Sequence, residues 1–285
     1  MRIDKYTIPS MVLLGALLAA GTADAAREGT LYYVNDFDGA DACGGSDLSW
    51  GDDTVGYLED KLDDWGFDSV YYHGNRWLDF EDVSDADENV NGEDEVSSRG
   101  IDSADIGMMY SHGGKNCSGS HYSSVKMGDN DGASCTLLYS SSAAGNDSWW
   151  GDTDLNAMII DTCSSAQWCV WNNSAYFHAD GNFATFLGFH GLSYDSRKHT
   201  NNFEDFVDNS RYNGLGDNWV DELTRRPIGS NNDECAVAII FEDSSSDADF
   251  TFDYMGFDDW KTPGSHSTSY YYYINGCDPD GGNAL

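Results

Sequence analysis

Two short apolar runs, each ending in polar residues, most constrain the fold of this chain. Ile106–Tyr110 leads into Ser-His-Gly-Gly, and Leu155–Ile160 leads into Asp-Thr-Cys-Ser-Ser. Apolar runs of this length bounded by Gly, Ser and Asp indicate strands buried on both faces, as in a parallel sheet covered by helices. Side chains that follow such strands gather at the carboxyl edge of the sheet. We therefore expect His112 and Cys163 to meet at that edge.

Similar patterns predict the rest of one α/β domain over residues 26–285. Val55, Leu58 and Leu62 recur at helical spacing before Gly66, which predicts an amphipathic helix between the first two strands. A strand, helix, strand order with short loops indicates a right-handed crossover in a parallel sheet. The strands are expected near 31–35, 69–72, 104–110, 155–161, 184–190 and 235–241.

Two segments are expected to add to this core. The Ser- and Gly-rich stretch 113–151 contains the alternating runs His121–Met127 and Ser134–Tyr139, which predict an inserted hairpin over the strand ends. Cys117 and Cys135 flank it and could staple it. The aromatic C-terminal extension, about 250–285, is expected to add an edge strand or to wrap the domain.

The first 25 residues have the features of a secretory signal peptide. Arg2 and Lys5 precede the apolar run 11–20, and Ala23-Asp24-Ala25 is a small-x-small cleavage pattern. The run is too short to span a bilayer, and no second apolar segment of membrane length follows. We expect cleavage after Ala25 and a secreted protein, extracellular or periplasmic, without a membrane span.

The charge of the chain excludes two classes of partner. Fifty acidic residues stand against 14 basic ones, a formal net charge of −36. A surface of this sign repels nucleic acid and anionic lipid. An Asp-rich surface suits high salt or Ca²⁺-rich fluid, or is strongly solvated without a specific cation, and the sequence leaves these alternatives open.

An acidic loop between the second and third strands partly matches a calcium-binding loop. Its candidate oxygen ligands are Asp87, Asn89, Asn91 and Glu93. Gly92 stands at the sixth position of the pattern, where a sharp turn is needed, but Ser98 occupies the position of the bidentate Glu. Two interpretations remain, a Ca²⁺ site and a solvated acidic loop.

The seven cysteines indicate an oxidised protein with one thiol left over. Six can form three disulfides in 15 connectivities. The odd count is explained if Cys163 is the free one, although incomplete pairing or another free cysteine is the alternative. We expect a helix over Ser164–Asn172, whose N-terminus would stabilise a thiolate at Cys163.

A His-Gly after one buried strand and a Cys after the next resemble the cysteine-peptidase clan of caspases, legumains and gingipains. In that clan the Cys follows a residue-Ala pair, whereas here Asp161 and Thr162 precede Cys163. The resemblance implies a caspase-like three-layer sandwich with a mostly parallel six-stranded sheet, helices on both faces and an inserted hairpin. It also implies a peptide or protein substrate and no required cofactor.

Carried over residue by residue, the resemblance makes Cys163 the nucleophile and His112 the general base and acid. The backbone N–H groups of Gly113 and Cys163 would form the oxyanion hole. Asp161 would lie beside the pocket for the residue before the cut and favour Arg or Lys, or would instead cap the following helix. His190 is either an orienting residue or a structural one. The competing classes are an inactive caspase-like binding or structural domain and a salt- or calcium-adapted surface protein that binds glycans.

Overall fold

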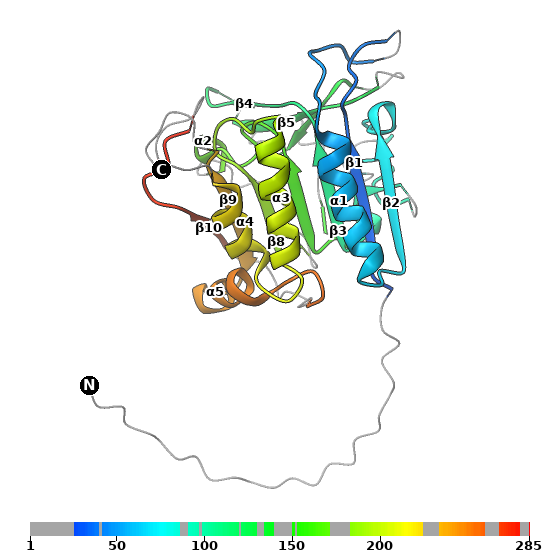
Figure 1. The fold of residues 1–285 in the computed structure, drawn as a ribbon. Coiled ribbons are helices and arrows are strands. Elements are labelled where there is room, and N and C mark those ends of the chain that lie inside the picture. The colour runs from blue at the N-terminus through cyan, green and yellow to red at the C-terminus, as the bar shows by residue number, and fades with distance from the viewer. Residues whose placement is uncertain are drawn as a thin grey trace, which may run out of the picture.

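A mixed seven-stranded sheet forms the centre of the molecule (Figure 1). The computed structural model describes residues 26–39, 42–85, 91–96, 99–119, 121–129, 134–139, 150–151, 153–171, 183–224, 234–259, 268–279 and 285. The strand order is β10-β9-β8-β7-β3-β1-β2. The strands are β1 (Glu28–Tyr33), β2 (Ser69–Gly74), β3 (Ile106–Tyr110), β7 (Ala157–Asp161), β8 (Thr185–Phe189), β9 (Ala236–Glu242) and β10 (Thr268–Tyr273).

The sheet is parallel from β2 to β8 and antiparallel at its other edge. All six expected strands form, but β9 runs antiparallel to β8, and β10 runs antiparallel to β9. Of the six expected strands, five are parallel and β9 is not, so the sheet is mixed. The reason is that two helices follow β8, α3 (Arg197–Asn209) and α4 (Leu215–Leu223). One helix returns the chain to the amino edge of the sheet, whereas a second brings it back to the carboxyl edge, where β9 begins.

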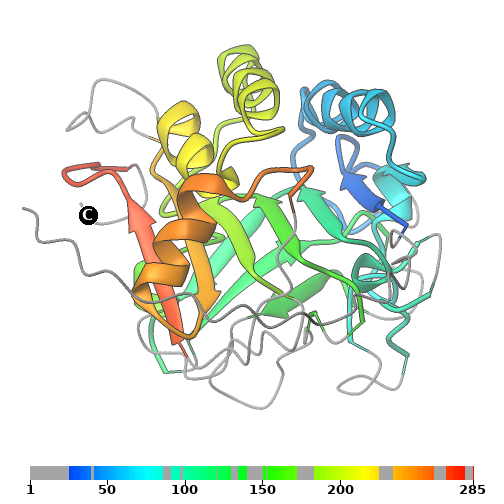
Figure 2. The same cartoon turned by 90° about the horizontal axis from the view of Figure 1, so that it is seen from below.

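The two faces of the sheet bury different clusters because side chains alternate along each strand. Met108 and Ile159 pack on the face that also buries apolar residues of α1 (Gly51–Asp64), α3 and α4. Met109 and Ile160 pack on the opposite face. In Figure 2 the helices α1, α3 and α4 lie together on one side of the sheet.

The second face is covered, in the described residues, mainly by strands and loops, with short helical segments in place of the long helices of the first face. A three-stranded antiparallel sheet lies here, with the order β4-β5-β6. Its strands are β4 (Gly113–Asn116), β5 (Tyr122–Lys126) and β6 (Thr136–Tyr139). Short helical segments accompany it, namely η1 (Asn75–Trp77), η2 (Ile101–Ser103) and α2 (Trp168–Trp171). The inserted segment therefore contributes three strands, of which β5 and β6 are the two expected from the alternating runs.

The C-terminal segment contributes a helix and an edge strand. Helix α5 (Ser245–Tyr254) begins at Ser244, whose side chain accepts a hydrogen bond from the N–H of Asp247. The aromatic composition did not indicate this helix. Strand β10 then closes the sheet against β9.

Candidate active site

The carboxyl ends of β3 and β7 bring the segments of His112 and Cys163 together. In this parallel pair Tyr110 lies opposite Asp161, so His112 and Cys163 each stand two residues beyond paired positions. The backbones then approach closely, because a Cβ atom at Gly113 would lie 2.3 Å from the carbonyl oxygen of Cys163. Only glycine fits this position without displacing the backbone after β7.

The imidazole of His112 is held from the loop after β1. Its Nε2 lies 2.7 Å from the carbonyl oxygen of Ser46, and its ring packs on Phe37 with centroids 4.8 Å apart. A carbonyl oxygen can only accept, so Nε2 carries a proton, and Nδ1 of the neutral ring is the basic nitrogen. This arrangement leaves Nδ1 available to take a proton.

Cys163 is the free thiol that the odd cysteine count predicted. All seven cysteines are described, and the other six form disulfides. The thiol is partly buried, and its Sγ lies 3.4 Å from the carbonyl oxygen of Ser193. Among the described residues, no hydrogen bond joins Cys163 to His112. Burial raises the pKa of the Cys163 thiol, and the carboxylates of Asp161 and Glu234 raise it further.

The predicted helix directly after Cys163 was wrong. Helix α2 begins only at Trp168, and Ser164 has a positive φ of 61°. The N–H groups of Ser164 and Ala166 donate to the carbonyls of Gly191 and Phe189 at the end of β8. These N–H groups bond to the end of β8 and are not the free N–H groups of a helix N-terminus. Among the described residues, a helix N-terminus next to Cys163 that would lower the pKa of its thiol is therefore missing.

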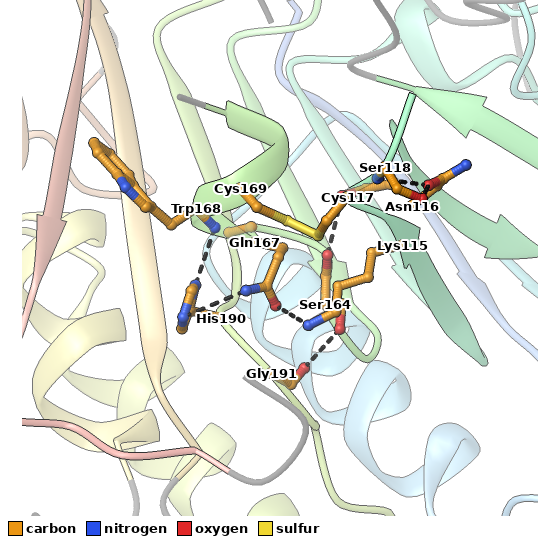
Figure 3. Close-up of a disulfide and its surroundings, with 12 residues drawn as sticks. Lys115, Asn116, Cys117, Ser118, Ser164, Gln167, Trp168, Cys169, His190 and Gly191 are labelled. Carbon is orange, nitrogen blue, oxygen red and sulfur yellow. Dashed lines mark hydrogen bonds between the residues drawn. A yellow bond between two sulfur atoms is a disulfide. The ribbon is translucent and has the colours of Figure 1, made fainter. Parts of the chain in front are cut away.

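A disulfide joins the segments that follow His112 and Cys163. Cys117, just after β4, pairs with Cys169 in α2 (Figure 3). The other pairs are Cys43–Cys135 and Cys235–Cys277. The expected staple between Cys117 and Cys135 was therefore wrong, because the small sheet is anchored to two other parts of the domain instead of closing on itself.

His190 is a buried residue that holds the start of α2. Its Nδ1 accepts a hydrogen bond of 3.0 Å from the N–H of Trp168, and its Nε2 lies 3.4 Å from Nε2 of Gln167 (Figure 3). The Oε1 atom of Gln167 accepts from Nζ of Lys115 at 2.7 Å. Burial lowers the pKa of Lys115. His190 thus supports the segment after Cys163.

Asp161 faces the interior. Its side chain is 0% exposed, with Oδ2 2.7 Å from Nε2 of His199 and Oδ1 accepting from the Ser193 hydroxyl at 2.8 Å. A carboxylate without exposed surface cannot contact a substrate side chain. The substrate contact predicted for Asp161 is therefore not made in this structure, where the carboxylate instead binds His199 and Ser193. The capping alternative also fails, because no helix begins beside Asp161.

Sequence reasoning missed the partners of Asp161 and of His112. His199 lies in the first turn of α3, next to the N-cap Ser196, and Glu234 lies just before β9. Each is a single polar residue at the end of an element, a pattern that also fits a solvent-exposed cap. Ser46 acts through its backbone carbonyl, so its side chain gave no signal.

The predicted calcium ligands fall partly outside the described residues. Asp87 and Asn89 lie outside them, whereas the Glu93 carboxylate forms an ion pair with Arg99. Asn91 lies in the same loop. Within the described ranges no cluster of three His, Cys, Asp or Glu residues is arranged to hold a metal ion. The Ca²⁺ site stays a prediction.

Comparison with known proteins gives no family for the chain. Neither the scan against protein-family models nor the search of curated proteins found a match. The fold and the site define an α/β protein with a mixed sheet, three disulfides, and a free cysteine and a histidine that follow adjoining strands. Among the described helices, none is both long and apolar enough to cross a bilayer. The signal peptide expected at 1–25 lies outside the described residues.

Proposed function

We propose that this protein is a secreted cysteine endopeptidase that uses His112 and Cys163. The observation that carries the proposal is that the free cysteine and a histidine follow neighbouring strands at the same sheet edge, in a chain whose other cysteines all form disulfides. An oxidising compartment accounts for the three disulfides, and a thiol left free there calls for a chemical reason. The order of the two residues, a His after one strand and a Cys after the next, is the order found in caspases, legumains and gingipains.

The reaction follows from the hydrogen bonding of His112. Nδ1 of His112 accepts the thiol proton, and the Cys163 thiolate attacks the carbonyl carbon of the scissile peptide bond. The imidazolium then donates its proton to the departing amine, which leaves a thioester. Water, deprotonated by His112, cleaves the thioester and restores the thiol. The backbone N–H groups of Gly113 and Cys163 are assigned to the oxyanion, since the glycine lets the two segments lie in contact.

Two features require a change of geometry before catalysis. The thiol bonds to Ser193 instead of His112, and burial raises its pKa. Catalytic hydrogen bonds are often long or misaligned without substrate and tighten in the complex. We assign this adjustment to substrate binding. A preference for basic residues before the cut then rests on the net charge of −36, which draws cationic peptides to the surface.

Active-site labelling tests the proposal. Mature protein is treated without reductant with peptidyl electrophiles that carry Arg, Lys or Asp at the reactive end, and the adduct is located by mass mapping. We expect labelling of Cys163 by the Arg and Lys probes and none in Cys163→Ala. Labelling by the Asp probe alone would support the peptidase function but contradict the proposed preference for basic residues before the cut.

Turnover of a peptide substrate gives the second test. Cys163→Ala and His112→Ala should each lower kcat/KM by at least about 10³-fold, and the double variant should lose little more, because nucleophile and base act as one unit. His73→Ala is the matched control, since this histidine lies near the end of another strand, β2, and stacks on Tyr32 with centroids 5.3 Å apart. Peptide turnover by Cys163→Ala at the wild-type rate would show that Cys163 is not the nucleophile.

The second candidate function is a binding domain with an inactive His-Cys pair. The raised pKa of Cys163 and the hydrogen bond from the thiol to Ser193 favour it. It becomes the better assignment if no peptidyl probe labels the wild-type protein, with or without Ca²⁺, while Cys163 is reduced.

A further inference from the structure

A buried cluster of three ionisable side chains lies directly behind Cys163. His199 lies between Asp161 and Glu234, with Nε2 2.7 Å from the Asp161 carboxylate and Nδ1 3.4 Å from the Glu234 carboxylate. All three side chains are 0% exposed. Such a cluster is costly to bury unless its charges balance and its hydrogen bonds are made.

The two carboxylates make His199 the cation of this cluster. Burial alone lowers the pKa of His199, but the Asp161 carboxylate, followed by Glu234, outweighs it and raises the pKa to about 10. The phenol of Tyr110 on β3 also faces the ring, with the two ring centroids 6.5 Å apart. His199 is therefore an imidazolium at neutral pH, and both ring N–H groups donate to carboxylates.

The cluster reaches Cys163 through the loop between β8 and α3. The Ser193 hydroxyl donates to Asp161 at 2.8 Å, and the carbonyl of the same residue accepts from the Cys163 thiol. The N–H of Tyr194 donates to Glu234 at 3.0 Å. Two consecutive loop residues are thus fixed by the two carboxylates that His199 holds.

The next residue fixes the same loop to the other side of the site. The Asp195 carboxylate accepts hydrogen bonds from the N–H groups of Ser49 and Trp50, at 2.7 and 2.9 Å, and from the Tyr110 hydroxyl at 2.9 Å. Ser49 follows, within three residues, the carbonyl of Ser46 that holds His112. The loop that touches the thiol is therefore tied to the segment that orients the histidine.

We propose that His199 is a positioning residue, which through Asp161 and Glu234 holds the loop 193–195 against Cys163 and sets the ionisation of the thiol. The proposal rests on the proposed function in taking Cys163 as the reacting group. Removing the imidazolium leaves two uncompensated carboxylates beside the thiol, whereas removing the Asp161 charge leaves His199 and Glu234 as a neutral pair. The two changes shift thiol ionisation in opposite directions.

The test is the pH dependence of Cys163 alkylation by iodoacetamide, measured on the mature protein without reductant. We expect His199→Gln to raise the midpoint of the rate profile by about one pH unit and Asp161→Asn to lower it by a similar amount. The double variant should return towards the wild-type midpoint, because its cluster keeps only the Glu234 charge and so has the same net charge, −1, as the two carboxylates and one imidazolium of the wild type.

Thr200→Val is the matched control. Thr200 follows His199 in α3, is fully buried and bonds to the Thr54 hydroxyl at 3.0 Å. This variant loses a buried hydrogen bond beside the cluster without changing its charge, so its midpoint should equal that of the wild type. Equal midpoints in folded His199→Gln and Thr200→Val would overturn the proposal and leave His199 a structural residue.

Two further outcomes keep the two proposals separable. If His199→Gln does not fold, Asp161→Asn decides, and an unchanged or raised midpoint in that variant overturns the positioning role. Iodoacetamide needs no substrate recognition. If the alkylation midpoints of the two variants shift in opposite directions but the protein hydrolyses no peptide, the positioning role is supported and the peptidase function is overturned. If the protein hydrolyses peptides but neither midpoint shifts, the peptidase function is supported and the positioning role is overturned.

Discussion

Two buried aspartates at opposite ends of the same strand pair differ in what they bind. Asp102 lies before β3, at the amino end, and its carboxylate accepts from the backbone N–H groups of Gly151, Thr153 and Leu155 before β7. Asp161 ends β7, at the carboxyl end, and binds the side chains of Ser193 and His199. One carboxylate fixes backbone, and the other belongs to an ionisable cluster beside a thiol.

The difference separates a sheet end whose buried carboxylate binds backbone from one whose buried carboxylate binds side chains, one of them titratable. Backbone donors do not titrate, so the bonds of Asp102 persist at any pH at which the carboxylate is charged. One of the two bonds of Asp161 is made with a titratable partner, His199, and the other is made with Ser193 in the neighbouring loop. Polar groups at the carboxyl edge of a parallel sheet commonly carry function, which agrees with this division.

The largest effect is expected from Asp102→Ala. Three backbone donors lose their acceptor in a site that is 0% exposed. At about 1–3 kcal/mol for each buried group left without a partner, the free energy of unfolding should fall by at least about 3 kcal/mol. Urea denaturation measures it, with Asp102→Asn, which keeps one acceptor oxygen, as the intermediate control. A loss below about 1 kcal/mol would contradict the structural role.

Removing the Cys117–Cys169 disulfide should come next. The bond spans 52 residues and joins the segments after His112 and Cys163. Replacing both cysteines with serine should reduce the free energy of unfolding by about 2–4 kcal/mol, because the unfolded chain gains conformational freedom. KM should rise as well, since the two site segments are no longer tied together. An unchanged KM in the folded variant would show that the buried cluster alone positions the site.

Gly113→Ala should affect activity more than stability. The new methyl group would lie 2.3 Å from the Cys163 carbonyl oxygen and must displace backbone. We expect a loss of about 1–3 kcal/mol in stability and about 100-fold in kcat. Gly114→Ala is the matched control, because its methyl group would meet only the Ser124 hydroxyl oxygen, at 3.2 Å. Similar kcat values in both variants would remove Gly113 from the site.

The last effect is a pH slope in stability, which is small for each pH unit. The pKa of His199 is raised in the folded state, so its stabilising effect is complete below the unfolded value of 6.5 and is lost as pH rises towards about 10. The free energy of unfolding should fall over this interval by at most about 1.4 kcal/mol per pH unit. The fall should be present in Thr200→Val and absent in His199→Gln. Denaturant titrations between pH 6.5 and 9.5 measure the difference.

The sequence by itself determined the α/β class, the positions of six strands and the placement of His112 and Cys163 after two of them. It did so because each strand is a buried apolar run, and because a parallel pair puts the residues after its strands at one edge. It also predicted that Cys163 is the free thiol, from the odd number of cysteines.

Tertiary structure alone decided the direction of β9, the cysteine pairing and the surroundings of the thiol. The local sequence patterns between β8 and β9 do not show at which edge of the sheet β9 begins, because this depends on whether one or two helices cross the sheet face. Disulfide partners depend on which loops lie side by side, not on their order in the chain. The partners of Asp161 are 32 and 38 residues away in sequence, at Ser193 and His199. The sequence around a single polar residue does not show that the residue will be buried beside a charge. Burial depends on segments that are distant in sequence and come together only when the chain folds.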